Sequence, residues 1–254
     1  MRLHLHEWGD PDAPAVVCLH GITAHGLRFR RLAEERLADR FRVLAPDLRG
    51  HGRSEPEPPW TFDTFVNDVL ETIDAAGVAS AAWVGHSFGG RLALEIAAAA
   101  PERVERLALL DPAFHVLPHV ALNRAETAGQ SFVSPEDAVE ARLQTDPDSP
   151  REFVEEDVEQ HLELASDGHY RYRFCRSTVV SVYGELATQP PPPETVQVPV
   201  LIVHAPAFGL VREEHLAAYP GAEILAVPGS HMVYWDAWKQ TADAVQGFLE
   251  NPSA

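Results

Sequence analysis

The stretch Trp83-Val84-Gly85-His86-Ser87-Phe88-Gly89-Gly90 decides how this chain folds. It contains the pattern Gly-x-Ser-x-Gly, preceded by the apolar run from Ala81 and followed by a helix-forming run that stops at Pro101. A sharp turn from a buried strand into a helix holds a serine hydroxyl clear of the backbone, and its crowding requires glycine on either side. The five residues alone also fit a glycine turn whose serine has no role. The strand and helix around them favour a nucleophile elbow, with Ser87 as the nucleophile.

The composition bounds the class of protein. The chain has 254 residues, of which 45% are hydrophobic, enough for one large α/β domain or a core with a small insert. The formal charge of −18 argues against nucleic acid or an anionic membrane as a partner. No run approaches the roughly 20 apolar residues of a membrane span, and the N-terminus is too polar for a secretory signal. The two cysteines, Cys18 and Cys175, are expected to be buried free thiols, which fits a reducing cytoplasm.

Apolar runs alternate with helical patterns along most of the chain. This rhythm predicts an α/β fold with a mostly parallel, doubly wound sheet covered on both faces. Leu3 to Trp8 alternate in polarity and predict an edge strand or the first arm of a hairpin. The predicted inner strands are Ala15–His20, Phe41–Pro46, Ala81–Val84, Val104–Asp111, Val198–His204 and Glu223–Val227.

The rhythm breaks between residues 112 and 193. Short helical stretches replace the strands there, for example Pro135–Leu143 and Arg151–Leu164, and four prolines close the segment as a stiff connector. We therefore expect a core formed by residues 1–111 and 194–254, with residues 112–193 inserted as a helical cap.

A serine nucleophile needs a base, an orienting acid and an oxyanion hole. Of the 13 histidines, His231 is the candidate base. It lies in a Gly-Ser-His loop after the last predicted strand, which places it at the carboxyl edge of the sheet, where sites form in open α/β folds.

Four motifs, taken in order, resemble the α/β-hydrolase superfamily nearly end to end. They are His20-Gly21, Asp47-Leu48-Arg49-Gly50-His51-Gly52-Arg53-Ser54, Gly85-His86-Ser87-Phe88-Gly89 and Gly229-Ser230-His231. The resemblance implies that the backbone N–H groups of Ile22 and Phe88 form the oxyanion hole, where each donor contributes roughly 3–4 kcal/mol. It also implies that His20, His51 and Asp47 shape loops, and that the cap follows the family's sixth strand.

The orienting acid departs from the family's commonest pattern, which places an aspartate after the strand that ends at Val203. The loop here reads His204-Ala205-Pro206-Ala207-Phe208-Gly209-Leu210-Val211, and Phe208 occupies the expected position. Some branches of the superfamily take the acid from the loop after the sixth strand, where this chain has Asp111. The order Ser87, Asp111, His231 matches the usual order of the fold. The alternatives are Glu213 or Glu214, or a weak or absent acid.

Members of the family with a nucleophilic aspartate are dehalogenases and epoxide hydrolases, whereas a serine favours acyl transfer. We expect hydrolysis of a carboxylic ester or lactone of an apolar small molecule, with no metal and no cofactor. The alternatives are a thioesterase, an amidase, a carbon–carbon bond hydrolase, a cofactor-free peroxidase, or a catalytically weak ligand-binding member.

Arg171, Arg173 and Arg176 fit either a subsite for a carboxylate or phosphate or a solvated face. The oligomeric state, monomer or homodimer, stays open. Candidate substrate-binding residues are His86, Phe114, Phe208, Met232 and Trp235.

Overall fold

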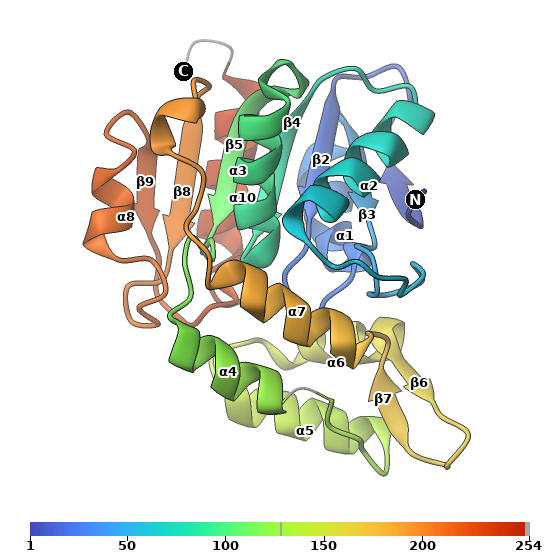
Figure 1. Cartoon of the computed structure of the whole chain (residues 1–254). Helices are drawn as coiled ribbons and strands as arrows, with labels where there is room; N and C mark the ends of the chain where they lie inside the picture. Colours follow the sequence, from blue (N-terminus) through green and yellow to red (C-terminus); the bar gives the residue numbers. More distant parts are fainter. Residues whose placement is uncertain (128, 252–254) are drawn as a thin grey trace.

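A mostly parallel sheet runs through the core of the molecule (Figure 1). The computed structural model describes residues 1–127 and 129–251, and within them seven strands form this sheet in the order β1-β3-β2-β4-β5-β8-β9. The edge strand β1 is antiparallel to β3, and the other neighbours are parallel. The strands are β1 (Leu5–Trp8), β2 (Ala15–Leu19), β3 (Arg42–Pro46), β4 (Ala81–His86), β5 (Val104–Leu110), β8 (Val200–His204) and β9 (Glu223–Ala226).

Helices cover both faces of the sheet, as its continuous apolar strands predict. Along β2, Val17 and Leu19 pack into one core, whereas Val16 and Cys18 pack into the other, because successive side chains point to opposite faces. The first face is covered by α2 (Phe62–Ala75) and α3 (Phe88–Ala99). The opposite face is covered by η1 (Gly26–Phe29), α1 (Arg30–Leu32), η2 (Ala33–Leu37) and α10 (Trp238–Glu250), and the short helices elsewhere are η3 (Pro101–Arg103), η4 (Pro193–Thr195), α8 (Glu213–Ala217) and α9 (Val233–Asp236).

The elements from α4 to α7, between β5 and η4 in the chain, gather across one end of the sheet (Figure 1), and we call them the cap. One strand rather than two precedes β2, so the strand before the cap is the fifth in this chain. The predicted helix Arg151–Leu164 is too long, because Leu162 pairs with Tyr172 in a small hairpin. The cap elements are α4 (Pro118–Thr127), α5 (Pro135–Thr145), α6 (Arg151–His161), β6 (Leu162–Leu164), β7 (Tyr170–Tyr172) and α7 (Arg176–Leu186).

The structure bears on the predictions of buried free thiols and of no membrane span. Both cysteines are free, but only Cys18 is fully buried, since Cys175 lies partly exposed at the start of α7. Burial raises the pKa of the Cys18 thiol. In the described residues, no helix is both long and apolar enough to cross a membrane.

Candidate active site

Ser87 lies in the sharp turn between β4 and α3, with φ 55° and ψ −116°. A Cβ atom added to Gly85 would lie 2.4 Å from the carbonyl oxygen of Gly89, and one added to Gly89 would lie 2.0 Å from that of Leu19. No side chain fits at either distance, so both glycines are required by the turn, as the sequence predicts. In the described residues, the hydroxyl of Ser87 has no hydrogen-bond partner and faces a cavity. Such bonds to a base are often long in ligand-free enzymes and shorten when substrate binds.

A short hydrogen bond joins the side chains of His231 and Asp111. Oδ2 of Asp111 accepts a hydrogen bond of 2.6 Å from Nδ1 of His231, and the carboxylate is fully buried. The backbone N–H of Ala205 donates to Oδ1 at 3.3 Å. A carboxylate on Nδ1 keeps the proton there and leaves Nε2 as the acceptor. The geometry therefore brings together three residues from separate predicted strand ends.

The alternative acids lie elsewhere. Glu213 and Glu214 are exposed at the start of α8, and Glu214 pairs with Arg212 at 2.7 Å. The ring of Phe208, in the position where the commonest family pattern has an aspartate, stacks on His231 with 4.9 Å between centroids.

Backbone strain is concentrated at this site. In the described chain, the non-glycine residues with positive φ are Thr23 (58°), Ser87 (55°) and Asp111 (40°). Side chains cost energy in this region of φ, and such residues persist where the surrounding structure holds them. Hydrogen bonds supply that hold, because the N–H of Ser87 donates to Leu110 and the N–H of Ala113 donates to the carbonyl of Ser87.

The loop before His231 is fixed by a carboxylate that sequence patterns do not reveal. Oδ2 of Asp236 accepts from the backbone N–H of Ser230 at 2.6 Å and from its hydroxyl at 2.7 Å. The other oxygen, Oδ1, accepts from the hydroxyl of Ser149 in the cap at 2.7 Å. Asp236 thus connects the loop of the histidine to the cap.

The turn after β2 is held by neutral His20. The N–H of Leu48 donates to Nε2 of His20 at 2.9 Å, so the ring proton lies on Nδ1 and donates to the carbonyl of Gly21 at 2.8 Å. Burial lowers the pKa of His20 well below its usual value, in agreement with a neutral ring. The N–H of Phe88 opens α3, where helix geometry provides no internal acceptor. Ile22 and Ser87 line one cavity, and Phe88 directly follows Ser87, so the oxyanion role of the two N–H groups stays a prediction.

The cavity beside Ser87 has a volume of about 290 Å³. Its apolar lining residues come from the core and the cap: Ile22, Ala113, Val116, Val120, Leu186, Phe208, Leu210 and Met232. Its polar and charged lining residues are Thr23, Arg28, His86, Ser87, Arg124, Arg142, Thr145, Asp146, Tyr183 and His231. A cavity that combines apolar side chains with convergent polar groups is typical of sites for small-molecule ligands.

Comparisons with known proteins identify the family of the chain. The family model for the alpha/beta hydrolase fold matches residues 14–172. Lipase LipV of Mycobacterium tuberculosis is 36% identical over 250 residues, which cover 91% of each chain. The chain belongs to the α/β-hydrolase family. The sn-1-specific diacylglycerol lipase ABHD11 of Mus musculus is 27% identical over 95% of this chain and 82% of its own. The solved structure of E-2-(acetamidomethylene)succinate hydrolase has the same fold, with a TM-score of 0.90 at 24% identity over 98% of this chain and 95% of its own.

The protein is therefore a hydrolase with an α/β-hydrolase fold. In this hydrolase, two of the predicted substrate-binding residues do not line the cavity of Ser87. Phe114 is buried instead against Tyr219 and His215, because its ring turns toward α8. Trp235 lies near Phe153 of the cap in a tilted arrangement and lines a separate, smaller cavity with Arg28.

His86 lines the cavity of Ser87, but its ring is hydrogen-bonded to the backbone of His231. Nε2 of His86 donates to the carbonyl of His231 at 3.0 Å, and the two rings lie 4.6 Å apart. Burial, followed by the nearby His231, lowers the pKa of His86 well below its usual value. The neutral ring therefore supports the backbone of His231.

The arginines singled out in the sequence lie at the surface of the cap, and Arg176 at the start of α7 is exposed. Arg171 pairs with Asp167 at 2.6 Å, and Arg173 pairs with Glu163 at 3.3 Å. Both guanidinium groups are partly exposed on the hairpin of the cap, which supports the interpretation as a solvated face.

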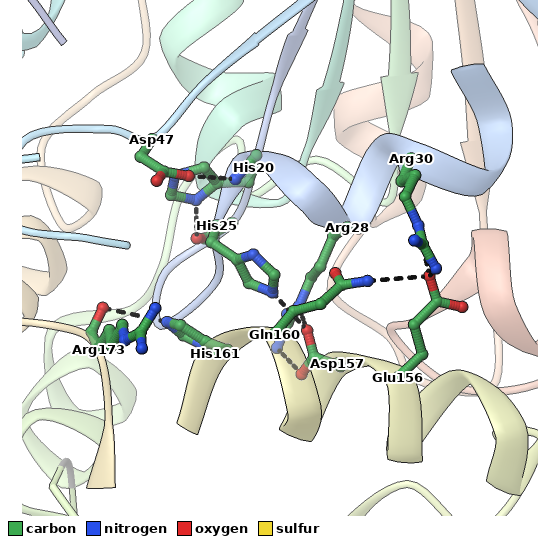
Figure 2. A network of polar contacts seen from close by, with 12 residues as sticks. His20, His25, Arg28, Arg30, Asp47, Glu156, Asp157, Gln160, His161 and Arg173 are labelled. Carbon is green, nitrogen blue, oxygen red and sulfur yellow. Dashed lines mark hydrogen bonds and ion pairs between the residues drawn. The ribbon is translucent and has the colours of Figure 1, made fainter. Parts of the chain in front are cut away.

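One buried group of side chains brings three possible metal ligands together. The ligand atoms of His25, Asp157 and His161 lie within 4.8 Å of one another. Figure 2 shows that the guanidinium of Arg28 is hydrogen-bonded to the carboxylate of Asp157, with Nε 2.6 Å from Oδ1 and Nη2 2.8 Å from Oδ2. A guanidinium in that place repels a cation, so this cluster favours an ion pair between core and cap. A second group of three possible ligands consists of His4, His6 and Asp47. Both carboxylate oxygens of Asp47 already accept hydrogen bonds, from the backbone N–H groups of Gly26 and Arg53.

Proposed function

We propose that this α/β-hydrolase cleaves a carboxylic ester or lactone of an apolar small molecule through an acyl-enzyme intermediate. One observation supports the proposal above all: the buried carboxylate of Asp111 lies 2.6 Å from Nδ1 of a histidine that shares a cavity with Ser87. This is the arrangement in which a serine hydroxyl becomes a nucleophile.

In the proposed reaction, Oγ of Ser87 attacks the carbonyl carbon while Nε2 of His231 takes its proton. The charge that develops on the carbonyl oxygen is stabilised by the N–H groups of Ile22 and Phe88. The tetrahedral intermediate expels the alcohol, which receives the proton from His231. Water then attacks the acyl group with His231 again as base, and the acid and free Ser87 are released.

The role of Asp111 in this scheme is to hold the proton on Nδ1 and to stabilise the imidazolium that forms. The similarity to proteins named as lipases supports an ester as the bond cleaved. The apolar side chains that share the cavity with Ser87, among them Ile22 and Met232, support an apolar group in the substrate.

The test begins with a fluorophosphonate probe, which should label the wild-type protein and fail to label Ser87→Ala. A panel of aryl and alkyl esters graded by acyl length, with lactones, thioesters, amides and diketones, is then assayed with both proteins. We expect turnover of esters or lactones by the wild type and loss of about 10³-fold or more in Ser87→Ala. Equal turnover in the two proteins would refute the proposal. A preference for thioesters, amides or diketones would change the class of bond that we propose is cleaved, but Ser87 would remain the proposed nucleophile.

A further inference from the structure

Thr23, in the turn after β2, has a strained backbone and lines the cavity of Ser87. In the described chain, three non-glycine residues have a positive φ, and two of them, Ser87 and Asp111, carry side chains of the proposed mechanism. The third is Thr23, with a φ of 58°. For a β-branched side chain this conformation is a rare outlier. Strain of this kind gathers at functional sites, where other interactions hold it in place.

The turn explains the backbone of Thr23 but not its side chain. The N–H of Ala24 donates to the carbonyl of Gly21 at 3.3 Å, which closes a turn with Thr23 as its third residue. Where this position has a positive φ, glycine is favoured, because it adopts that φ at no steric cost. A glycine would therefore form the same turn with less strain, and the threonine side chain needs a separate reason.

Structural contacts do not supply that reason for the hydroxyl of Thr23. Among residues 1–127 and 129–251 it has no hydrogen-bond partner, and the residue is only partly buried. Thr145 of α5 also lines the cavity of Ser87 and gives a contrast, because its hydroxyl donates to the carbonyl of Ala141 at 3.1 Å. The hydroxyl of Thr23 is therefore available to a bound molecule.

Thr23 lies where two cavities meet. The cavity of Ser87 adjoins a second cavity of about 300 Å³ under the cap, and Thr23, Thr145 and Tyr183 are among the residues that line both. Ser87 and His231 line only the first of the two. A substrate that is bound at Ser87 and extends into the second cavity therefore passes Thr23.

We propose that the hydroxyl of Thr23 donates a hydrogen bond to an uncharged oxygen of the substrate, so that the preferred esters carry an ether or carbonyl oxygen beyond the scissile group. A purely alkyl chain at this place would leave the hydroxyl unpaired in a cavity from which the substrate displaces water, and that is unfavourable. Thr23 is thus a specificity-determining residue outside the triad. This inference rests on the proposed function and deepens it by naming a feature of the substrate.

The experiment exchanges one methylene of an ester for an ether oxygen without changing the length of the chain. Methyl methoxyacetate, 3-methoxypropanoate and 4-methoxybutanoate are compared with methyl butanoate, pentanoate and hexanoate, and 2-methoxyethyl acetate is compared with butyl acetate, by pH-stat titration. The measured quantity is the ratio of kcat/KM for each ether to that of its alkyl match. The oxygen changes the reactivity of the ester equally in every variant, so a change of this ratio between variants reports the contact.

Thr23→Val keeps the branched shape without the hydroxyl and should lower the best ratio about threefold to tenfold, mainly through KM of the ether. Thr23→Ser keeps the hydroxyl and should retain the ratio within about twofold. Thr23→Gly should also lower the ratio, but it should raise Tm by about 2–4 °C, because glycine relieves the strained φ.

Thr64 on α2, which lines neither cavity, provides the matched control. Thr64→Val should leave the ratio unchanged. Thr64→Gly should lower Tm, since glycine weakens a helix, so the opposite signs of the two glycine variants isolate the strain at Thr23.

Two results overturn the inference. One is a ratio in Thr23→Val equal to that of the wild type, and the other is a Tm that falls in Thr23→Gly as it does in Thr64→Gly. In either case, cleavage of the alkyl esters that is lost in Ser87→Ala leaves the proposed function standing.

If the wild type cleaves no ester, the proposed function falls, and calorimetric titration decides the contact at Thr23. The methoxy esters are titrated into Ser87→Ala and into the double variant with Thr23→Val. Weaker binding by the double variant supports the contact, and equal affinity refutes it.

Discussion

Replacing Asp111 with asparagine tests the arrangement on which the mechanism depends. One oxygen of this buried carboxylate accepts from Nδ1 of His231 at 2.6 Å, and the other accepts from the N–H of Ala205 at 3.3 Å. An asparagine can satisfy only one of these donors with its oxygen. If the oxygen stays on Ala205, the amide NH₂ faces Nδ1, and His231 must move its proton to Nε2, where it can no longer accept from Ser87. If the amide flips, two N–H groups of Asn and Ala205 oppose each other in a buried place.

Either arrangement removes the productive state of the histidine. We expect kcat to fall by about 10³- to 10⁴-fold, which corresponds to about 4–5 kcal/mol of transition-state stabilisation, with little change in KM. The assay is hydrolysis of the best substrate from the ester panel, with thermal unfolding to show that the variant is folded. Glu213→Gln and Glu214→Gln are the control variants, because these carboxylates lie on the surface. A kcat for Asp111→Asn within tenfold of the wild type would refute the assignment, and a loss confined to Glu213→Gln or Glu214→Gln would move the acid to α8.

Further predictions concern the turn, the cap and the pH dependence of stability. Gly89→Ala should prevent folding or abolish turnover, because its Cβ would lie 2.0 Å from the carbonyl oxygen of Leu19; Gly247→Ala, in open space on α10, should instead stabilise the protein by up to about 1 kcal/mol in urea titrations. Ser149→Ala removes the bond from the cap to Asp236 and should lower kcat/KM severalfold and Tm by about 2–4 °C, and unchanged values of both would argue that this bond does not position the loop. Burial lowers the pKa of His51 to about 4, so below pH 6.5 the unfolded state binds the extra proton and the folded state does not. The free energy of unfolding should therefore fall as the pH is lowered from 6.5 to 4, by up to about 1.4 kcal/mol per pH unit for each such histidine. Burial also lowers the pKa of His20, His86 and His161, so these three residues add to the slope. Urea unfolding at pH 7, 6 and 5 measures the slope, and an unfolding free energy that does not change with pH would contradict the burial argument.

The fold and the position of the nucleophile were predictable because local rules decide them. Apolar runs of strand length, glycines beside Ser87 and a helix-forming run after it all act within a dozen residues. The contact between His231 and Asp111 spans 120 residues, yet both follow strands, and parallel strands end at the same edge of the sheet.

What the sequence did not reveal depends on how the cap packs. Arg28, Arg124 and Arg142, which line the cavity of Ser87, lie on η1, α4 and α5, and no spacing in the sequence relates them. Phe114 follows Asp111 closely and suggests a pocket residue, but its ring turns to Tyr219 because the chain bends away from the sheet at Pro112. Ser149 and Asp236 are ordinary surface types in the sequence, and only their meeting across the interface of core and cap gives them a role.

The position of Asp111 has a consequence for how substrate preference can change over evolution. The partner of the histidine sits at the end of β5, directly beside the strand that bears Ser87, where backbone hydrogen bonds tie the two segments together. The loop after β8 offers His231 only the face of Phe208, a ring that is 42% exposed at the cavity. Beyond Ala205, whose N–H holds Asp111, substitutions in that loop should therefore change the lining of the cavity without removing the acceptor of the proton on Nδ1.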